Sequence, residues 1–378
     1  MQKSPRELTD LLNTVKEFAK RHIFPRRREL ITATEFPADL WQVFAECGLA
    51  GLSIPAQYGG QGASYQTLSK AAHFLNLYGG VPGATMTFLA HWQIIKLHIV
   101  EEAEPSLKQQ LLPLLAAGKA TLSVAISEPK AGAHPKHLQT TADRVGDEFI
   151  LNGEKAFLTN GPLAQYFIVL AITKELNARR SFSAVLVDAK TPGLERTDGV
   201  KIDFLHPCPH GGIRLQNCKV PVANLIGIEG EAFVRTSLRM RAIEDAVGAA
   251  SHIGALACLL NDIIDIIPEK LAEKVGRIES QFLALDIVAE ALGQMADQTE
   301  EDMEFLLHLQ LGFRQQLMAC GTVMDEIVQE IDLSNKPETA LLLRDINKLH
   351  SIAHSAHAAR LVKFGRNKLS LTLANRKI

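Results

Sequence analysis

Two neighbouring stretches, Val124-Ala-Ile-Ser-Glu-Pro-Lys-Ala-Gly-Ala-His134 and Gly153-Glu-Lys-Ala-Phe-Leu-Thr-Asn-Gly161, decide how this chain is interpreted. They place two small hydroxyl residues, Ser127 and Thr159, and an aromatic residue, Phe157, around apolar segments that end in Pro- and Gly-containing turns. An aromatic ring can cover one face of a flat ligand, while hydroxyl and backbone N–H groups bond to its edge. The two stretches therefore suggest a binding site for a planar ring.

The bulk composition is that of an ordinary globular protein. The chain has 378 residues, of which 47% are hydrophobic and 22% charged, and this length allows two or three domains. A net charge of −2 gives no electrostatic footprint for nucleic acid, so we expect no nucleic-acid partner. The cysteines are dispersed, which favours reduced thiols in a cytosolic protein: Cys47, Cys208, Cys218, Cys258 and Cys320.

The chain shows no targeting or membrane-spanning signal. Its N-terminus, Met1-Gln-Lys-Ser-Pro-Arg-Glu7, is polar and lacks an apolar signal core. No uncharged apolar run reaches the roughly 20 residues that a spanning helix needs. The longest such run, Val247–Leu260, contains His252 and is typical of a buried helix. We therefore expect a cytoplasmic protein without a membrane span.

The hydrophobic period changes twice along the chain. Residues 1–120 have helical spacing and predict an N-terminal helical domain. Residues 121–230 contain short β-rich segments separated by turn residues, among them 148–151, 155–158 and 201–205, which predict an antiparallel sheet or β-barrel domain. Residues 231–378 return to helical spacing in long segments near 231–266, 270–298, 301–333 and 337–372, as in a four-helix bundle. The predicted fold is mainly α with a central β domain.

Further local patterns occur in order along the chain. They are Phe36-Pro-Ala-Asp-Leu-Trp41, Gly48-Leu-Ala-Gly-Leu-Ser-Ile-Pro55, Tyr58-Gly-Gly60, Gln109-Gln-Leu-Leu-Pro-Leu-Leu-Ala-Ala-Gly118, and Val220-Pro221 followed by Asn224-Leu-Ile-Gly227, Glu229-Gly230 and Phe233. Together with the two opening stretches, their order and spacing over residues 1–260 resemble the acyl-CoA dehydrogenase family. This resemblance implies that family's order of domains: helical, β-barrel, helical bundle.

The resemblance also implies FAD as cofactor and an acyl-CoA or related thioester as substrate. Ser127 and Thr159 would bond to the edge of the flavin ring, and Phe157 would flank it. Lys270 stands where the family has an arginine that grips the FAD pyrophosphate, although lysine cannot form the bidentate fork. Lys130 and His134 either supply a cation for a substrate phosphate or are solvated loop residues. An electron acceptor such as electron-transfer flavoprotein, a homodimer or homotetramer, and a role in fatty acid metabolism follow from the same resemblance.

The chemistry implied by the resemblance needs a carboxylate base, and Glu244 is the best candidate. The C-terminal segment that carries the family's usual catalytic Glu is not recognisable, but a minority of the family places its base at the position of Glu244. A Glu in a dry cleft has a raised pKa and can remove a proton next to a thioester. Alternatively, Glu244 is a surface acid paired with Arg241, three residues earlier. Asp245 is the weaker candidate, because it points about 100° away on a helix.

Two metal-ligand patterns carry less weight. His206-Pro-Cys-Pro-His210 lacks a second Cys/His cluster that would complete a tetrahedral site, so a loop is favoured. His350, His354 and His357 recur at helical spacing and favour a polar stripe on a helix.

The sequence leaves three functions open. The first is an FAD-dependent dehydrogenase that converts an acyl thioester to its α,β-enoyl form. The second is a relative that has lost catalysis and serves as a binding or assembly subunit. The third is a flavin oxidase or monooxygenase on the same scaffold.

Overall fold

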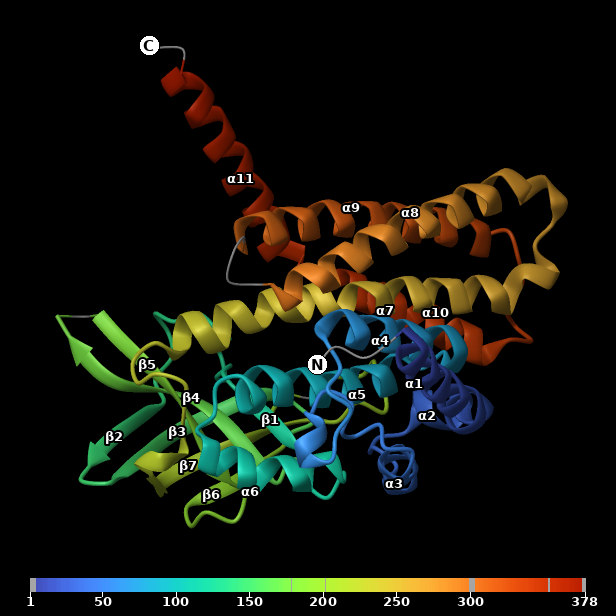
Figure 1. Cartoon of the computed structure of the whole chain (residues 1–378). Coiled ribbons are helices and arrows are strands. Elements are labelled where there is room, and N and C mark those ends of the chain that lie inside the picture. Colours follow the sequence, from blue (N-terminus) through green and yellow to red (C-terminus); the bar gives the residue numbers. More distant parts are fainter. Residues whose placement is uncertain (1–4, 178, 201, 299–302, 353, 376–378) are drawn as a thin grey trace.

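The computed structural model describes residues 5–177, 179–200, 202–298, 303–352 and 354–375. N-terminal helices and a central sheet lie together below a bundle of long C-terminal helices in the view of Figure 1. The predicted fold, mainly α with a central β domain, is confirmed.

The N-terminal helices surround a hairpin of two buried ones, α4 and α5. They are α1 (Pro5–Phe18), α2 (Arg27–Thr32), α3 (Ala38–Glu46), α4 (Tyr65–Gly79), α5 (Pro82–Ile94) and α6 (Pro105–Ala116). Ser64 caps α4 by accepting a hydrogen bond from the Thr67 amide at 3.2 Å, and the helix ends at Gly80, whose φ is 64°. Pro82 then starts α5 in its first turn, where a missing N–H costs nothing. Local sequence thus sets the tight connection between the two helices.

The central sheet is mixed, with strand order β6-β7-β3-β2-β4-β5-β8 and β1 added in parallel to β4. Its strands are β1 (Leu122–Ala125), β2 (Thr141–Val145), β3 (Glu148–Thr159), β4 (Tyr166–Leu176), β5 (Arg179–Asp188), β6 (Leu194–Thr197), β7 (His210–Pro221) and β8 (Leu225–Ile226). β1 and β3 end at Ala125 and Thr159, so the two stretches quoted at the outset meet at one region of the sheet.

Two strand predictions were wrong in detail. Two short strands were expected at 148–151 and 155–158, but β3 is continuous through both. Gly153 permits this because its φ is 149° and a Cβ there would lie 2.4 Å from Thr140 Oγ1. A strand was also expected at 201–205; residues 203–205 form bends instead, Ile202 has no regular structure, and Lys201 lies outside the described residues. The long strand β7 was missed, because Arg214, Gln216 and Lys219 make its pattern look like a polar loop.

The C-terminal bundle begins with a short π-helical segment, η6 (Phe233–Leu238). It continues with α7 (Arg239–Ile263), α8 (Ala272–Asp297), α9 (Met303–Val328) and α10 (Pro337–Ser351), followed by α11 (His354–Asn375). The predicted fourth helix, 337–372, is therefore two helices. The backbone is extended at Ile352, with ψ 135°, and α11 points away from the bundle in Figure 1.

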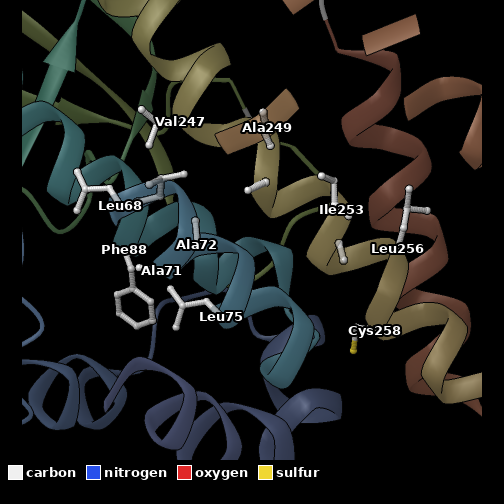
Figure 2. Packing of buried hydrophobic residues seen from close by; sticks show 14 of the residues in the cluster. Leu68, Ala71, Ala72, Leu75, Phe88, Val247, Ala249, Ile253, Leu256 and Cys258 are labelled. Carbon is white, nitrogen blue, oxygen red and sulfur yellow. The ribbon is translucent and has the colours of Figure 1, made fainter. Parts of the chain in front are cut away.

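Helix α7 is the central core helix and packs closely against α4. Figure 2 shows the α4 side chains of Leu68, Ala72 and Leu75 near those of Val247 and Ile253 on α7. Gly254 makes the approach possible, since a Cβ there would lie only 2.4 Å from the carbonyl oxygen of His73. By length and composition alone the helical run Phe233–Ile266 could cross a membrane, but 61% of its most apolar window is buried inside the protein.

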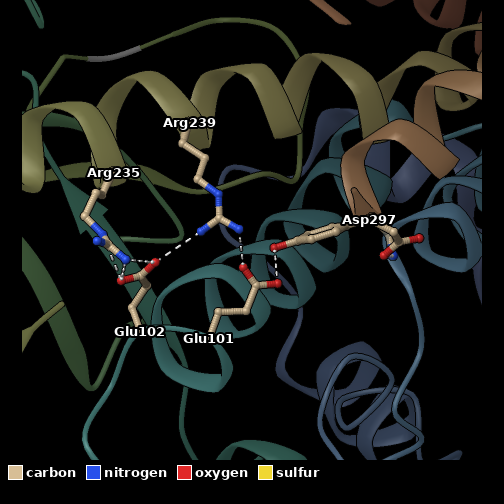
Figure 3. A network of polar contacts seen from close by, with 6 residues as sticks. Glu101, Glu102, Arg235, Arg239 and Asp297 are labelled. Atoms are coloured by element: carbon tan, nitrogen blue, oxygen red, sulfur yellow. Dashed lines mark hydrogen bonds and ion pairs between the residues drawn. The ribbon is translucent and has the colours of Figure 1, made fainter. Parts of the chain in front are cut away.

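An ionic network fixes the start of α7 against the N-terminal helices (Figure 3). Arg239 donates from Nη2 to Glu101 at 2.8 Å and from Nη1 to Glu102 at 3.2 Å. Arg235 also pairs with Glu102, at 3.1 Å, and the Tyr65 hydroxyl donates to Glu101 at 2.9 Å. Arg239 and Glu102 are partly buried, whereas Glu101 is more exposed, so removal of Arg239 leaves a partly desolvated charge at Glu102.

Replacement of Arg239 tests this network. We expect Arg239→Met to lower the free energy of unfolding by about 2 kcal/mol, because Glu101 loses the guanidinium that pairs with it and Glu102 keeps only Arg235. Arg21→Met is the matched control: Arg21 pairs with Glu17 within one exposed helical turn and should cost less than about 0.5 kcal/mol. Urea unfolding measures both. Equal losses for the two variants would contradict the role given to the network.

Candidate functional site

One deep pocket lies where the sheet, α5, α7 and α9 meet. It holds about 450 Å³ and is lined by residues from each of these elements. Ser127, Phe157 and Thr159 enter it from the ends of β1 and β3, and Glu244 enters from α7. The structure therefore brings together four residues that the sequence singled out.

Backbone and side-chain hydrogen bonds connect the stretches 124–134 and 153–161, which carry the ring-site residues Ser127, Phe157 and Thr159. The Ala156 amide donates to the Ser127 carbonyl at 2.8 Å, and Ser123 Oγ donates to the Thr159 carbonyl at 2.7 Å. Phe157 has a φ of 60°, which is uncommon for a bulky residue, and its side chain remains 46% exposed. A backbone held in this region to present an aromatic side chain is typical of a functional position.

A buried ion pair lies beneath these stretches. Lys155 is fully buried, and its Nζ donates to Glu128 Oε1 at 2.9 Å and to the Ile126 carbonyl at 3.0 Å. Glu128 also accepts from the Thr140 amide at 2.9 Å and the Thr140 hydroxyl at 2.6 Å. These bonds are on both sides of Ser127 in the chain, so they fix its position.

Protonation of this pair follows from its burial and partners. Burial lowers the pKa of Lys155 to about 8, although the Glu128 carboxylate opposes this effect. Burial alone raises the pKa of Glu128, but Lys155 and the bonds from Thr140 outweigh it and hold that pKa below its ordinary value. The geometry supports an ionised Glu128 at neutral pH.

Glu244 has the environment that a general base needs. Glu244 is exposed by its accessible surface, but that surface faces the pocket, and many protein atoms lie around the carboxyl group. Burial raises the pKa of Glu244 to about 7; the neighbouring Asp245 raises it further and Arg241 lowers it. Among the ion pairs of the described residues, none joins Glu244 to Arg241. Glu244 is nevertheless exposed and Arg241 acts on its charge, so the alternative of a surface acid near Arg241 stays open.

Asp245 was expected to point away from Glu244, yet it also lines the pocket. Its carboxylate lies 3.5 Å from Arg360 and 4.0 Å from His357, both in the first turns of α11. Burial raises the pKa of Asp245, and Arg360 is the strongest of the groups that oppose this. The pocket is wide enough for two adjacent positions of α7 to reach it.

The other predicted binding residues lie outside the pocket. Lys130 and His134 are exposed on a loop closed by hydrogen bonds between Glu128 and Gly132, and only Ala133 of this loop lines the pocket. Lys270 is 65% exposed and donates to Glu330 at 2.5 Å. The roles proposed for these three residues in binding phosphate groups stay predictions.

The metal alternatives gain no support. Among the described residues, no group of three or more His, Cys, Asp or Glu side chains could hold a metal ion. Cys208 is buried, and burial raises the pKa of its thiol to about 12. His350 does not lie on an exposed stripe: its ring packs 5.8 Å from that of His252. The side chain of His354 lies outside the described residues.

Sequence reasoning missed the polar residues at the α9 side of the pocket. Arg314 and Gln310 on α9 and His252 on α7 all line it. No motif contains them, and each occurs singly within an otherwise ordinary helical pattern. Only the packing of α7, α9 and α10 places them together.

A helical domain, a mixed sheet and a helical bundle surround this pocket. Residues 5–119 match the N-terminal domain of acyl-CoA dehydrogenases and residues 123–218 match the middle domain, together more than half of the chain. The chain belongs to the acyl-CoA dehydrogenase family.

Individual relatives are similar over part of their length. The chain is 33% identical to cyclohex-1-ene-1-carbonyl-CoA dehydrogenase of Syntrophus aciditrophicus, over 60% of this chain and 55% of that enzyme. It is 34% identical to L-prolyl-[peptidyl-carrier protein] dehydrogenase of Pseudomonas fluorescens, over 52% of each. The structure of butyryl-CoA dehydrogenase from Megasphaera elsdenii superposes with a TM-score of 0.84 at 21% identity, over 98% of this chain and all of that one.

The buried pair is tested by removing one partner at a time. We expect Lys155→Met and Glu128→Gln each to lower the free energy of unfolding by about 3 to 5 kcal/mol, because each leaves the other group buried and unpaired. The double variant Glu128→Met/Lys155→Met should cost less than the sum of the single ones. Urea unfolding gives these values. Additive losses would show that the two groups act independently.

Proposed function

We propose that this protein is a flavin-dependent dehydrogenase that oxidises an acyl thioester to its α,β-enoyl form. The observation that carries the proposal is Glu244, a carboxyl group whose pKa is raised to about 7, in the same pocket as the ring-site residues Ser127, Phe157 and Thr159. Relatives in the family are FAD-binding flavoproteins. FAD is therefore the proposed cofactor.

The residues present fit the ring end of FAD. Phe157 offers an exposed aromatic face, and the hydroxyls of Ser127 and Thr159 can bond to a ring edge. Lys155 and Glu128 hold these positions from below, so the surface is formed in advance. When bound, FAD would supply the acceptor for a hydride from the β-carbon.

Glu244 performs the other half of the reaction. Its carboxylate removes the proton from the carbon next to the thioester carbonyl, and the carboxyl group then holds that proton. A pKa near 7 makes the group basic enough to take the proton while much of it remains ionised at neutral pH. Since α7 is fixed by the Arg239 network and by α4, Glu244 has a defined place in the pocket.

The proposal includes two kinds of thioester carrier, CoA and a carrier protein. Among the relatives, one acts on a CoA thioester and another on a prolyl group on a peptidyl-carrier protein. We propose that the substrate is an acyl group carried as a thioester on CoA or on a carrier protein. The proposed electron acceptor is an electron-transfer flavoprotein. A homo-oligomer in the cytoplasm remains part of the proposal.

A lapsed binding subunit is the second candidate. The placement of Lys270 favours it, because the residue expected at the FAD pyrophosphate is exposed and paired with Glu330. A protein that takes up no FAD on reconstitution would support this candidate and exclude dehydrogenation.

Substitution of Glu244 tests the dehydrogenase. Wild-type protein reconstituted with FAD should show the flavin absorbance, and a panel of acyl-CoA and acyl-pantetheine thioesters should bleach it without oxygen. Glu244→Gln should bind FAD equally well but bleach about 10²- to 10⁴-fold more slowly, because the base is gone. Glu273→Gln, an exposed acid of α8, is the control and should match the wild type. Bleaching of Glu244→Gln at the wild-type rate would show that another group is the base.

The pH dependence follows from the raised pKa of Glu244. Only the carboxylate can take the proton, so activity is lost as the pH falls through about 7. We expect the bleaching rate to fall about tenfold per pH unit below this value and to level off above it. Stopped-flow measurements from pH 5 to 9 give the profile. A midpoint near the ordinary carboxyl value of about 4 would contradict a buried base.

A further inference from the structure

One face of α7 continues beyond Glu244 into a polar part of the pocket. Glu244, Gly248 and His252 are four residues apart and therefore share a face of the helix. A Cβ at Gly248 would meet no heavy atom within 4 Å, so the space between the acid and the imidazole is open. At 1.5 Å per residue, Glu244 and His252 lie about 12 Å apart along the helix axis. A substrate that reacts at Glu244 can extend over Gly248 towards His252.

Arg314 of α9 lines the same part of the pocket. Its Nη2 donates to the carbonyls of His350 and Ile352, at 2.7 and 2.6 Å, and so binds the end of α10. These bonds occupy one of its three nitrogens. Among the hydrogen bonds and ion pairs of the described residues, none uses Arg314 Nε or Nη1. A guanidinium with this free capacity in a pocket is suited to a carboxylate.

Two neutral imidazoles accompany Arg314. Burial lowers the pKa of His252 to about 3 and that of His350 to about 4, with Arg314 contributing in the same direction. Each ring can therefore offer one N–H donor at neutral pH. His252 lines the pocket, and the ring of His350 packs 5.8 Å from it. Among the described residues, the buried Nε2 of His350 has no hydrogen-bond partner.

The charges facing this part of the pocket do not cancel. Arg314 and Arg360 are cationic, and Asp245 is the acid beside them, already 3.5 Å from Arg360. Arg314 is partly buried; burial lowers the pKa of its guanidinium, and Asp245 opposes this effect. A purely apolar acyl chain would desolvate Arg314 further without giving it an acceptor, and such a loss costs more than a hydrogen bond gains.

The walls before this region are apolar, with Leu89 and Met86 from α5 and Leu311 and Leu317 from α9. They suit a short run of methylene groups between the reacting carbon and a polar end group. The pocket thus combines an acid at its reactive position, an apolar middle and a cationic end.

We propose that the pocket selects thioesters whose acyl group ends in a carboxylate, with Arg314 as its anchor and His252 as a neutral donor. This inference rests on the proposed function for the position of the thioester at Glu244. It names the class of substrate: the monothioester of a dicarboxylic acid.

Binding measurements test the selection without requiring turnover. Isothermal titration calorimetry of the FAD-reconstituted protein should give glutaryl-CoA a dissociation constant about 10- to 100-fold lower than that of pentanoyl-CoA, which has the same carbon chain and no carboxylate. Arg314→Met should abolish this preference, because glutaryl-CoA loses its anchor and pentanoyl-CoA no longer desolvates a guanidinium. Arg277→Met, which removes an arginine paired with Glu273 on the surface of α8, should keep it.

Arg314→Met also removes the hydrogen bonds to the end of α10, so two further variants separate this structural effect from the loss of the anchor. Arg314→Lys keeps a cation and should retain part of the preference. His252→Leu leaves Arg314 and its bonds to α10 in place and should reduce the preference about 2- to 10-fold. Equal binding of the two thioesters by the wild type, or absence of binding by either, would overturn the inference. So would an unchanged preference in Arg314→Met, because the carboxylate would then bind elsewhere.

The inference and the proposed function fail in different ways. Selective binding of glutaryl-CoA without bleaching of the flavin would leave the inference standing and exclude the dehydrogenase. Bleaching by pentanoyl-CoA as rapid as by glutaryl-CoA, with equal affinities, would support the dehydrogenase and exclude the selection.

Discussion

The candidate site depends on the buried ion pair between Lys155 and Glu128. One member belongs to β3 and the other to the loop after β1, and their hydrogen bonds reach Ile126 and Thr140 as well. A backbone bond from the Ala156 amide to the Ser127 carbonyl adds to this pair in holding the loop that carries Ser127 against β3. A buried charge pair contributes little net stability, but its geometry is specific because any other arrangement leaves a charge unpaired. The position of Ser127 at the ring site is thus determined by the buried ion pair between Lys155 and Glu128.

Helix α7 joins the three parts of the molecule. Its start is held by Glu101 and Glu102 from the N-terminal helices, its middle packs on α4, and one of its faces supplies Glu244 and the open position at Gly248. The 25 residues of α7 therefore have to provide both the packing contacts and the pocket residues. The result is a helix with a weakly amphipathic sequence, since it is buried on one side by α4 and on the other by the bundle.

The sequence was sufficient for the scaffold and for part of the site. Hydrophobic periods and turn residues predicted the order of helical, β and helical regions, and family-like motifs pointed to Ser127, Phe157, Thr159 and Glu244, which the structure places in one pocket. Local pattern failed where tertiary contacts decide: Gly153 lets β3 continue, and Ile352 ends α10 by an extended residue. Arg314 and His252 were not identifiable in advance, because their meaning comes from helices that are distant in sequence.

The direction of α11 has a consequence for the pocket. Its first turns carry His357 and Arg360, which contact Asp245 in the pocket wall, whereas the residues from Val362 to Ser370 are exposed. A helix transmits a tilt along its whole length, because its backbone bonds keep it rigid over several turns. The orientation of α11 therefore sets the distance between Arg360 and Asp245, which is 3.5 Å here. One wall of the pocket thus depends on the orientation of α11, whose outer part lies outside the bundle.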